Sequence, residues 1–258
     1  MTHHVRTVVI PMAGEGRRML PVSRGAPKEL MPVGGTPLIV HALLEAAASG
    51  FEEILIVLSP EKERLLPWIR SEAPEGVRVV AVLQPRPLGL ADAQDRCRDR
   101  LGGEPFAVLL PDTLFAGREP GLLQVKEAFE STGRDTLGLI RVRPGEVFSD
   151  CGAVEIEPQA GEPFPLLRSV GSKRPGLLHV PAGETRLRAF PRSVFLPHYF
   201  DFVDGVREDL RPGEELDDVP VLQRMVEEVG VTGLALKGRG WDAGTPEGLA
   251  RAREDFGG

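Results

Sequence analysis

Short apolar runs alternate with amphipathic stretches through the first half of the chain. Apolar runs of this length are typical of strands buried on both faces of a sheet. In the stretch 38–48, Leu38, Ala42 and Ala46 fall on one face of a helix. The same reading predicts strands at 8–10, 54–58, 77–83 and 106–110, and helices at 38–48, 61–70 and 90–101. This order predicts an α/β fold with a doubly wound, mainly parallel sheet.

After about residue 135 the pattern changes to strand-like segments separated by proline and glycine. It predicts strands at 136–142, 151–156, 166–170, 187–196 and 231–236, and helices at 198–210, 219–229 and 246–255. The chain shows neither an internal repeat nor a linker long enough to separate two domains. We therefore expect one domain over residues 1–258, with the second half adding strands to the sheet and a lid over its edge.

Composition and charge exclude several classes of protein. With 41% hydrophobic and 27% charged residues, the chain has an ordinary globular composition. Its net charge of −7 is opposite to that of proteins that bind the nucleic-acid backbone, so we expect no nucleic-acid partner. It lacks a signal-peptide core and an apolar run of about 18 residues, which predicts no membrane partner. Only Cys97 and Cys151 occur, which indicates a reducing, cytoplasmic location rather than a disulfide framework.

A glycine-rich loop directly after the first predicted strand is the strongest local signal. Gly14 and Gly16 allow backbone N–H groups to approach an anion, and Arg17 and Arg18 add positive charge. The spacing matches neither the Walker A loop nor the dinucleotide-binding fingerprint, which disfavours a dehydrogenase. Because the loop continues to about residue 33 and is rich in Gly, Pro, Arg and Lys, it predicts phosphate binding rather than a plain tight turn.

Two segments of this loop resemble the opening of the sugar-1-phosphate nucleotidyltransferases. They are residues 13–21, AGEGRRMLP, and residues 27–33, PKELMPV, and their separation is that of the family. Further segments at 84–93, 109–112, 214–218 and 241–247 are similar to later family motifs and follow in the same order. Over about residues 5–253 the chain looks most like the bacterial UTP–glucose-1-phosphate uridylyltransferases.

The resemblance implies a reaction and a set of site residues. A sugar-1-phosphate oxygen would attack the α-phosphorus of a nucleoside triphosphate and release pyrophosphate, with UTP and glucose-1-phosphate as the expected pair. Residues 1–135 would bind the nucleotide, and residues 136–258 would bind the sugar and supply the C-terminal helices. The implied roles are catalysis by Arg18 and Lys28; nucleotide binding by Ala13, Gly14, Glu15, Gly16, Arg17, Gln84 and Gly89; sugar binding by Gly152 and Lys173; and Mg²⁺ binding by Asp112 and Asp242.

The chain also departs from the family pattern. Arg17 stands where a small hydroxyl residue is usual, and Thr113 follows Asp112 where a second aspartate is usual. Ser172 replaces a glutamate that normally holds sugar hydroxyls, which leaves the sugar open. These departures keep two alternatives: thymidylyl transfer, and a catalytically silent nucleotide-sugar-binding regulator. The sequence leaves the oligomeric state open, a homo-oligomer included.

Taken singly, several of these residues have ordinary structural interpretations. Asp112 and Asp242 could be turn or cap aspartates, Gln84 a polar strand end, and Lys173 a solvated surface lysine. The charged stretches 61–64 and 96–100 are predicted to be solvated helix faces. Only the order of the motifs along the chain favours the functional roles.

Overall fold

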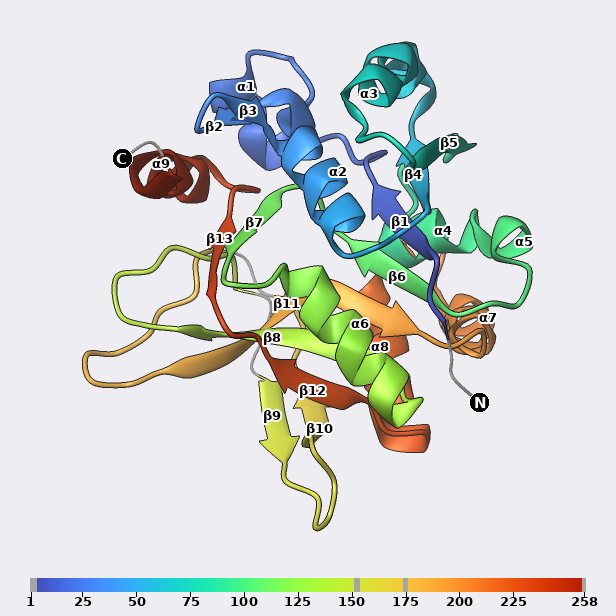
Figure 1. Cartoon of the computed structure of the whole chain (residues 1–258), viewed down its shortest axis with the longest axis vertical. Coiled ribbons are helices and arrows are strands. Elements are labelled where there is room, and N and C mark those ends of the chain that lie inside the picture. Colours follow the sequence, from blue (N-terminus) through green and yellow to red (C-terminus); the bar gives the residue numbers. More distant parts are fainter. Residues whose placement is uncertain (1–3, 151–153, 174–175, 257–258) are drawn as a thin grey trace.

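A large mixed sheet runs through the computed structural model, which describes residues 4–150, 154–173 and 176–256 (Figure 1). Within these residues the sheet has nine strands in the order β5-β4-β1-β6-β11-β8-β12-β10-β9. Their bounds are β1 Thr7–Pro11, β4 Glu53–Leu58, β5 Arg78–Leu83, β6 Phe106–Leu109, β8 Thr136–Val142, β9 Val154–Glu157, β10 Leu166–Val170, β11 Arg186–Phe195 and β12 Thr232–Ala235. Only β10 and β11 run against the other seven, which confirms the mainly parallel sheet and its extension by the second half.

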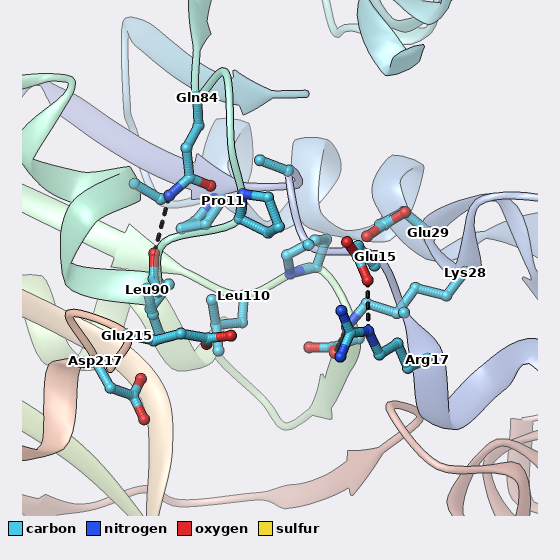
Figure 2. Close-up of a pocket in the computed structure, with 18 of the residues that line it drawn as sticks. Pro11, Glu15, Arg17, Lys28, Glu29, Gln84, Leu90, Leu110, Glu215 and Asp217 are labelled. Atoms are coloured by element: carbon cyan, nitrogen blue, oxygen red, sulfur yellow. Dashed lines mark hydrogen bonds and ion pairs between the residues drawn. The ribbon is translucent and has the colours of Figure 1, made fainter. Parts of the chain in front are cut away.

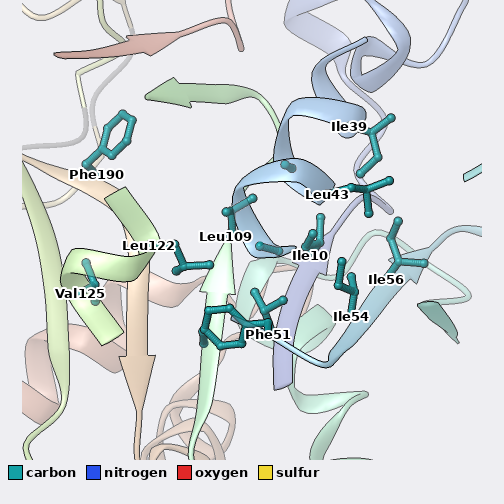
Figure 3. Close-up of a cluster of buried hydrophobic side chains, with 14 of the residues drawn as sticks. Ile10, Ile39, Leu43, Phe51, Ile54, Ile56, Leu109, Leu122, Val125 and Phe190 are labelled. Atoms are coloured by element: carbon teal, nitrogen blue, oxygen red, sulfur yellow. The ribbon is translucent and has the colours of Figure 1, made fainter. Parts of the chain in front are cut away.

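Helices cover both faces of the sheet because its strands are apolar on both sides. In β1, Val8 and Ile10 belong to one buried cluster and Val9 belongs to the other. The first cluster packs against α2 (Leu38–Ala48), α3 (Leu66–Glu72) and α6 (Gly121–Thr132), as Figure 3 shows for α2 and the strands beneath it. The second packs against α4 (Leu90–Asp95), α5 (Arg98–Leu101), α7 (Tyr199–Asp209) and α8 (Asp218–Glu228).

Two predicted helices of the first half are corrected, and one further helix was not predicted. The segment predicted as a helix at 61–70 begins with a 3₁₀ turn, η3 (Pro60–Leu65), before α3. The predicted helix 90–101 is divided into α4 and α5, because at Cys97 the backbone N–H bonds to the carbonyl of Gln94, three residues back. Helix α6 was not predicted, although it follows Pro120 and ends before Gly133, whose φ of 66° suits a helix C-terminus.

Two small ladders and a third buried cluster lie outside the main sheet. Strand β7 (Thr113–Ala116) pairs antiparallel with β13 (Arg239–Asp242), and β2 (Pro32–Val33) pairs with β3 (Thr36–Pro37). The cluster includes Met19, Leu38, Leu114 and Trp241, and it is closed by α9 (Pro246–Phe256). The connecting loop after β1 contains η1 (Arg17–Met19), α1 (Leu20–Ser23) and η2 (Lys28–Leu30). In the described part of the chain, no helix has the length and apolar character needed to cross a bilayer.

Candidate functional site

The glycine-rich loop and Asp112 meet where the strand order of the sheet reverses. Strand β1 lies between β4 and β6, and its carboxyl end leads into the loop, while the carboxyl end of β6 leads to Asp112. Ligands of open α/β sheets bind at such a switch point. A cavity of about 400 Å³ opens there (Figure 2), lined among others by the predicted residues Ala13, Gly14, Glu15, Gly16, Arg17, Arg18, Lys28, Gln84, Gly89, Asp112 and Lys173. The fold thus brings these predicted residues to one place.

The buried side chain of Lys62 anchors the glycine-rich loop. Its Nζ donates hydrogen bonds to the backbone carbonyls of Met12 at 2.7 Å and Gly14 at 2.8 Å. It also pairs with both carboxylate oxygens of Glu29, at 3.1 and 3.0 Å, and Glu29 is only 1% exposed. One ammonium group therefore joins the two family-like segments of the loop. The prediction that residues 61–64 form a solvated face is wrong at Lys62, since only its tertiary surroundings reveal its role.

Replacing Lys62 with methionine is expected to lower the free energy of unfolding by about 3–5 kcal/mol, because Glu29 would keep a buried charge without its partner. Urea denaturation measures this loss. The loop would also lose its anchor, so the Kd of a nucleoside triphosphate should rise at least roughly tenfold. The double variant Lys62→Met/Glu29→Leu should recover most of the stability and keep the raised Kd.

Lys126 offers a matched control for this substitution. It is also buried, and its Nζ lies 3.3 Å from the carbonyl of Ser49 and 3.4 Å from that of Gly50. Lys126→Met should cost about 1 kcal/mol and leave nucleotide affinity unchanged. Equal stability losses in the two variants, with no change in nucleotide affinity, would contradict an anchoring role for Lys62.

Lys28 and Asp112 form a largely buried ion pair on the wall of the cavity. Burial by itself would lower the pKa of Lys28, but the charges of Asp112 and Glu29 outweigh it, so the pKa is raised above its ordinary value. Burial would likewise raise the pKa of Asp112, and the charges of Lys28 and Arg18 outweigh it and lower this pKa. Both groups are therefore held in their charged forms, facing the cavity.

Asp242 reaches the same wall through the β7–β13 ladder. In this ladder Asp242 is paired with Thr113, and the N–H of Ala243 donates to the carbonyl of Asp112 at 2.8 Å. A Cβ added at Gly244 would lie 2.9 Å from Oδ2 of Asp112 and 3.1 Å from Oδ1 of Asp242, so these two oxygens are at most about 6 Å apart. Strands β7 and β13 are short and were not predicted, yet they bring the two distant aspartates together.

The Asp242 carboxylate is oriented by two residues that sequence analysis did not identify. The N–H of Ser149 donates to its Oδ2 at 2.9 Å, and Nη2 of Arg188 donates to the same oxygen at 3.0 Å. Arg188 is 5% exposed and also donates from Nε to the carbonyl of Ser149 at 3.1 Å. No motif marks Arg188, since it lies within an alternating strand whose burial only the tertiary packing decides.

The donor set of this wall suits a hard cation that also binds phosphate. Among the described residues, no group of three His, Cys, Asp or Glu side chains could enclose a metal ion. Mg²⁺ is usually held by one or two carboxylates together with substrate phosphates and water. Asp112 and Asp242 therefore fit Mg²⁺ in the presence of a phosphate-bearing ligand, and not as a closed protein cage.

Gln84 and Gly89 shape the far end of the cavity. Gln84 is buried, and its Nε2 donates to the carbonyl of Gly89 at 3.0 Å and to Oδ2 of Asp92 at 2.8 Å. Gly89 has a φ of 112°, and an added Cβ would lie 2.3 Å from the carbonyl oxygen of Leu216. Packing against Leu216 thus requires glycine at position 89, and Asp92 is a further buried residue that holds this loop.

A second cavity, of about 230 Å³, adjoins the first. Both are lined by Arg18, Leu90, Leu110, Asp112 and Lys173, and the second is also lined by Asp242 and Arg188. Its remaining wall is mainly apolar, with side chains from β8, β11, α7 and α8. Two ligands, one in each cavity, would therefore meet at Asp112 and Arg18.

Lys173 lies at the boundary of the two cavities and is not a free solvated lysine. Its Nζ pairs with Asp217 at 2.8 Å and with Asp218 at 2.8 Å. Burial would lower the pKa of Lys173, but these two carboxylates outweigh it and raise the pKa. Glu215 and Asp217 lie across the cavity from Glu15 and Arg17 (Figure 2). Gly152, predicted to contact a sugar, lies outside the described residues.

The charged stretch 96–100 was also predicted to be a solvated face, and this is wrong at two positions. Cys97 is fully buried, and burial raises the pKa of its thiol to about 12, which excludes an ionised nucleophile there. Arg98 pairs with both carboxylate oxygens of Asp204, at 2.8 and 2.9 Å, and so docks α5 onto α7. These residues stabilise the helical layer and take no part in the site.

Comparisons with known proteins identify the family and agree with the fold. The family model described as "Nucleotidyl transferase" matches residues 7–162. The chain is 29% identical to the UTP–glucose-1-phosphate uridylyltransferase of Bacillus subtilis (strain 168), over 98% of this chain and 91% of the relative. Among solved structures it is similar to a UDP-glucose pyrophosphorylase complexed with UDP-glucose, with a TM-score of 0.79 and 24% identity over 98% of both chains. A putative glucose-1-phosphate thymidylyltransferase from Bacillus anthracis gives a TM-score of 0.77 and 18% identity, over 98% of this chain and 96% of that one.

Proposed function

Because this chain belongs to the nucleotidyl transferase family, we propose that it joins UTP to glucose-1-phosphate and releases pyrophosphate. The observation that carries the proposal is the shared wall of the two cavities, where Arg18, Lys28, Asp112 and Asp242 converge. The choice of UTP and glucose-1-phosphate as substrates follows the 29% identical uridylyltransferase, whose match spans nearly the whole chain. A phosphate ester in each cavity would place a nucleophile and an electrophile at this wall.

The reaction needs charge neutralisation and orientation more than proton transfer. A phosphate monoester has a second pKa of about 6, so the attacking oxygen of the sugar phosphate is already ionised near pH 7. This oxygen forms a bond to the α-phosphorus of UTP, and the bond from that phosphorus to the bridging oxygen of the leaving pyrophosphate breaks. Transfers of this kind are accelerated mainly by positioned positive charge.

The positive charge of the chain itself comes from Lys28 and Arg18. Asp112 fixes the position of the Lys28 ammonium group, and Glu29 and Lys62 hold the segment on which Lys28 lies. Arg18 lines both cavities, so it can contact phosphate oxygens of either substrate. The backbone of Gly14 and Gly16, with Ala13, Glu15 and Arg17, forms the edge of the cavity and would cradle the triphosphate.

Asp112 and Asp242 would hold Mg²⁺, which supplies Lewis-acid stabilisation of phosphate charge when it is bound. Ser149 and Arg188 keep the Asp242 carboxylate turned toward Asp112, and β7 and β13 keep the two residues side by side. Asp242 lines the second cavity and Asp112 lines both, so an ion held by these two residues would be within reach of both substrates.

The remaining assignments concern the two organic groups. Gln84 and Gly89 would bind the base at the far end of the first cavity, and Lys173 would bind the sugar phosphate at the boundary, with Gly152 as a further sugar contact. Residues 1–135 thus form the nucleotide part, and residues 136–258 form the sugar part. Ser172, in place of the family's glutamate, leaves the sugar hydroxyls to other groups.

A grid of triphosphates and sugar phosphates tests this proposal. Release of pyrophosphate should be fastest with UTP and glucose-1-phosphate, and it should stop when EDTA removes the metal and resume when Mg²⁺ is added. A higher kcat/KM with dTTP than with UTP would show that the protein transfers a thymidylyl group rather than a uridylyl group. If no pair releases pyrophosphate while UDP-glucose still binds, the protein is instead a silent nucleotide-sugar-binding regulator.

A further inference from the structure

A third cavity, separate from the proposed active site, lies between the end of β8, the start of β13 and helix α9. Its volume is about 650 Å³, within the range of small-molecule sites. It shares no lining residue with the two cavities of the proposed active site. Figure 1 shows the loop after β8 extending beyond the sheet beside β13 and α9. This cavity is therefore a distinct place for a ligand.

Four arginines line this cavity, and two of them are paired with carboxylates. The four are Arg141, Arg143, Arg239 and Arg251; Glu146 lies 3.6 Å from Arg239, and Glu254 lies 3.3 Å from Arg251. Arg239 is held by Asp255 at 2.6 Å, and Arg251 lies 3.3 Å from the same carboxylate. In the described part of the chain, no ion pair joins Arg141 or Arg143 to a carboxylate. Two arginines are thus fixed in place and two are available to an anion.

The remaining lining favours a compact ligand with more than one anionic group. Gly145, Gly238 and Gly240 present backbone without side chains, and Ile140, Phe148 and Leu236 form an apolar floor. The planar guanidinium group binds phosphate through two parallel hydrogen bonds, which explains why arginine suits this role better than lysine. A small ester with two phosphates fits both the volume and the charge.

The cavity also touches both segments that hold Asp242. Phe148 on its floor precedes Ser149, whose N–H donates to Asp242, and Arg239 begins the strand that ends at Asp242. A ligand that binds to Arg239 and to the 143–148 loop would contact both of these segments. From this arrangement we propose that the third cavity binds a small, multiply charged phosphate ester, and that its occupation changes turnover by shifting Asp242. The second part of this proposal rests on the proposed function.

Calorimetric binding of 2,3-bisphosphoglycerate to the full chain tests the site without relying on activity. The wild type should bind one equivalent, and the variant Arg141→Ala/Arg143→Ala should bind at least tenfold more weakly. Arg168→Ala/Arg211→Ala removes two exposed arginines that do not line the cavity, and it should bind as the wild type does. Lys28→Met should also retain binding, because Lys28 lies in the nucleotide cavity.

Three outcomes would overturn the site. They are the absence of binding to the wild type, equal binding to the Arg141→Ala/Arg143→Ala variant, and loss of binding in Lys28→Met, which would place the probe in the nucleotide cavity. Citrate serves as a second probe, and if it binds more tightly than the bisphosphate, the ligand class is carboxylate rather than phosphate ester.

The regulatory part has its own readout. In the wild type, 2,3-bisphosphoglycerate should change kcat at least twofold at saturating substrates, and in Arg141→Ala/Arg143→Ala it should not, with the basal kcat unchanged. Binding without any change in kcat would contradict the coupling to Asp242, while the proposal that the third cavity binds the ligand would still hold. If the protein has no transferase activity, the proposed function is wrong. The calorimetric result would still show whether the third cavity binds the bisphosphate.

Discussion

Replacing Lys28 with methionine is expected to lower kcat roughly 100- to 1,000-fold, because one positioned positive charge is lost from the place where charge develops on the phosphates. Methionine keeps most of the side chain that packs against Gly16. The pKa of Asp112 is lowered and that of Lys28 is raised, so in the wild type both groups stay charged over roughly pH 5–9. The kcat of the wild type should therefore show no titration of this pair over this range, as measured by pyrophosphate release.

Lys237 provides the matched control, since it is an exposed lysine that lines neither active-site cavity. Lys237→Met should leave kcat within twofold of the wild type. Circular dichroism and thermal unfolding check that Lys28→Met is folded, because Asp112 loses its partner in that variant. A folded Lys28→Met protein with a near-normal kcat would show that the phosphates are stabilised elsewhere.

Replacing either Asp112 or Asp242 with asparagine should lower kcat roughly a hundredfold or more, since a metal ion contributes several kcal/mol of charge stabilisation to such a reaction. The concentration of Mg²⁺ that gives half the maximal rate should rise in each variant. The losses should not add in the double variant, because both carboxylates lie within about 6 Å and would hold the same ion. A double-mutant cycle measures this coupling.

Asp135 is a suitable control because it is buried and hydrogen-bonded but lines neither of the two active-site cavities. Its carboxylate accepts from the N–H of Leu196 at 2.8 Å and lies 2.7 Å from Nε2 of His198. Asp135→Asn should lower the thermal stability while leaving kcat and the Mg²⁺ requirement unchanged. If the losses of kcat in Asp112→Asn and Asp242→Asn are fully additive and the Mg²⁺ requirement is unchanged, the two residues act independently and do not hold one shared ion.

The sequence was most informative where local chemistry is specific. The glycine-rich loop can be recognised in the sequence because it follows an apolar strand and contains Gly16. The φ of Gly16 is 65°, a conformation that favours glycine. Strands β8 and β10 have the predicted bounds, and in β8 the nearly continuous burial leaves an apolar run in the sequence. Helix α6 was not predicted, although the sequence carries a comparable signal for it in its apolar spacing and in the flanking Pro120 and Gly133.

The sequence by itself determined the α/β class and the glycine-rich loop, and it predicted the residue types of the candidate site, because these depend on short-range periodicity and on glycine conformations. Only the tertiary structure decided that Lys62 is buried under the loop, that Arg188 orients Asp242, and that Asp242 lies beside Asp112. Strands β7 and β13 have four residues each and are far apart along the chain, so neither has enough periodicity to be recognised alone. Their pairing, and with it the proposed metal site, exists only because the rest of the fold brings the two strands into register.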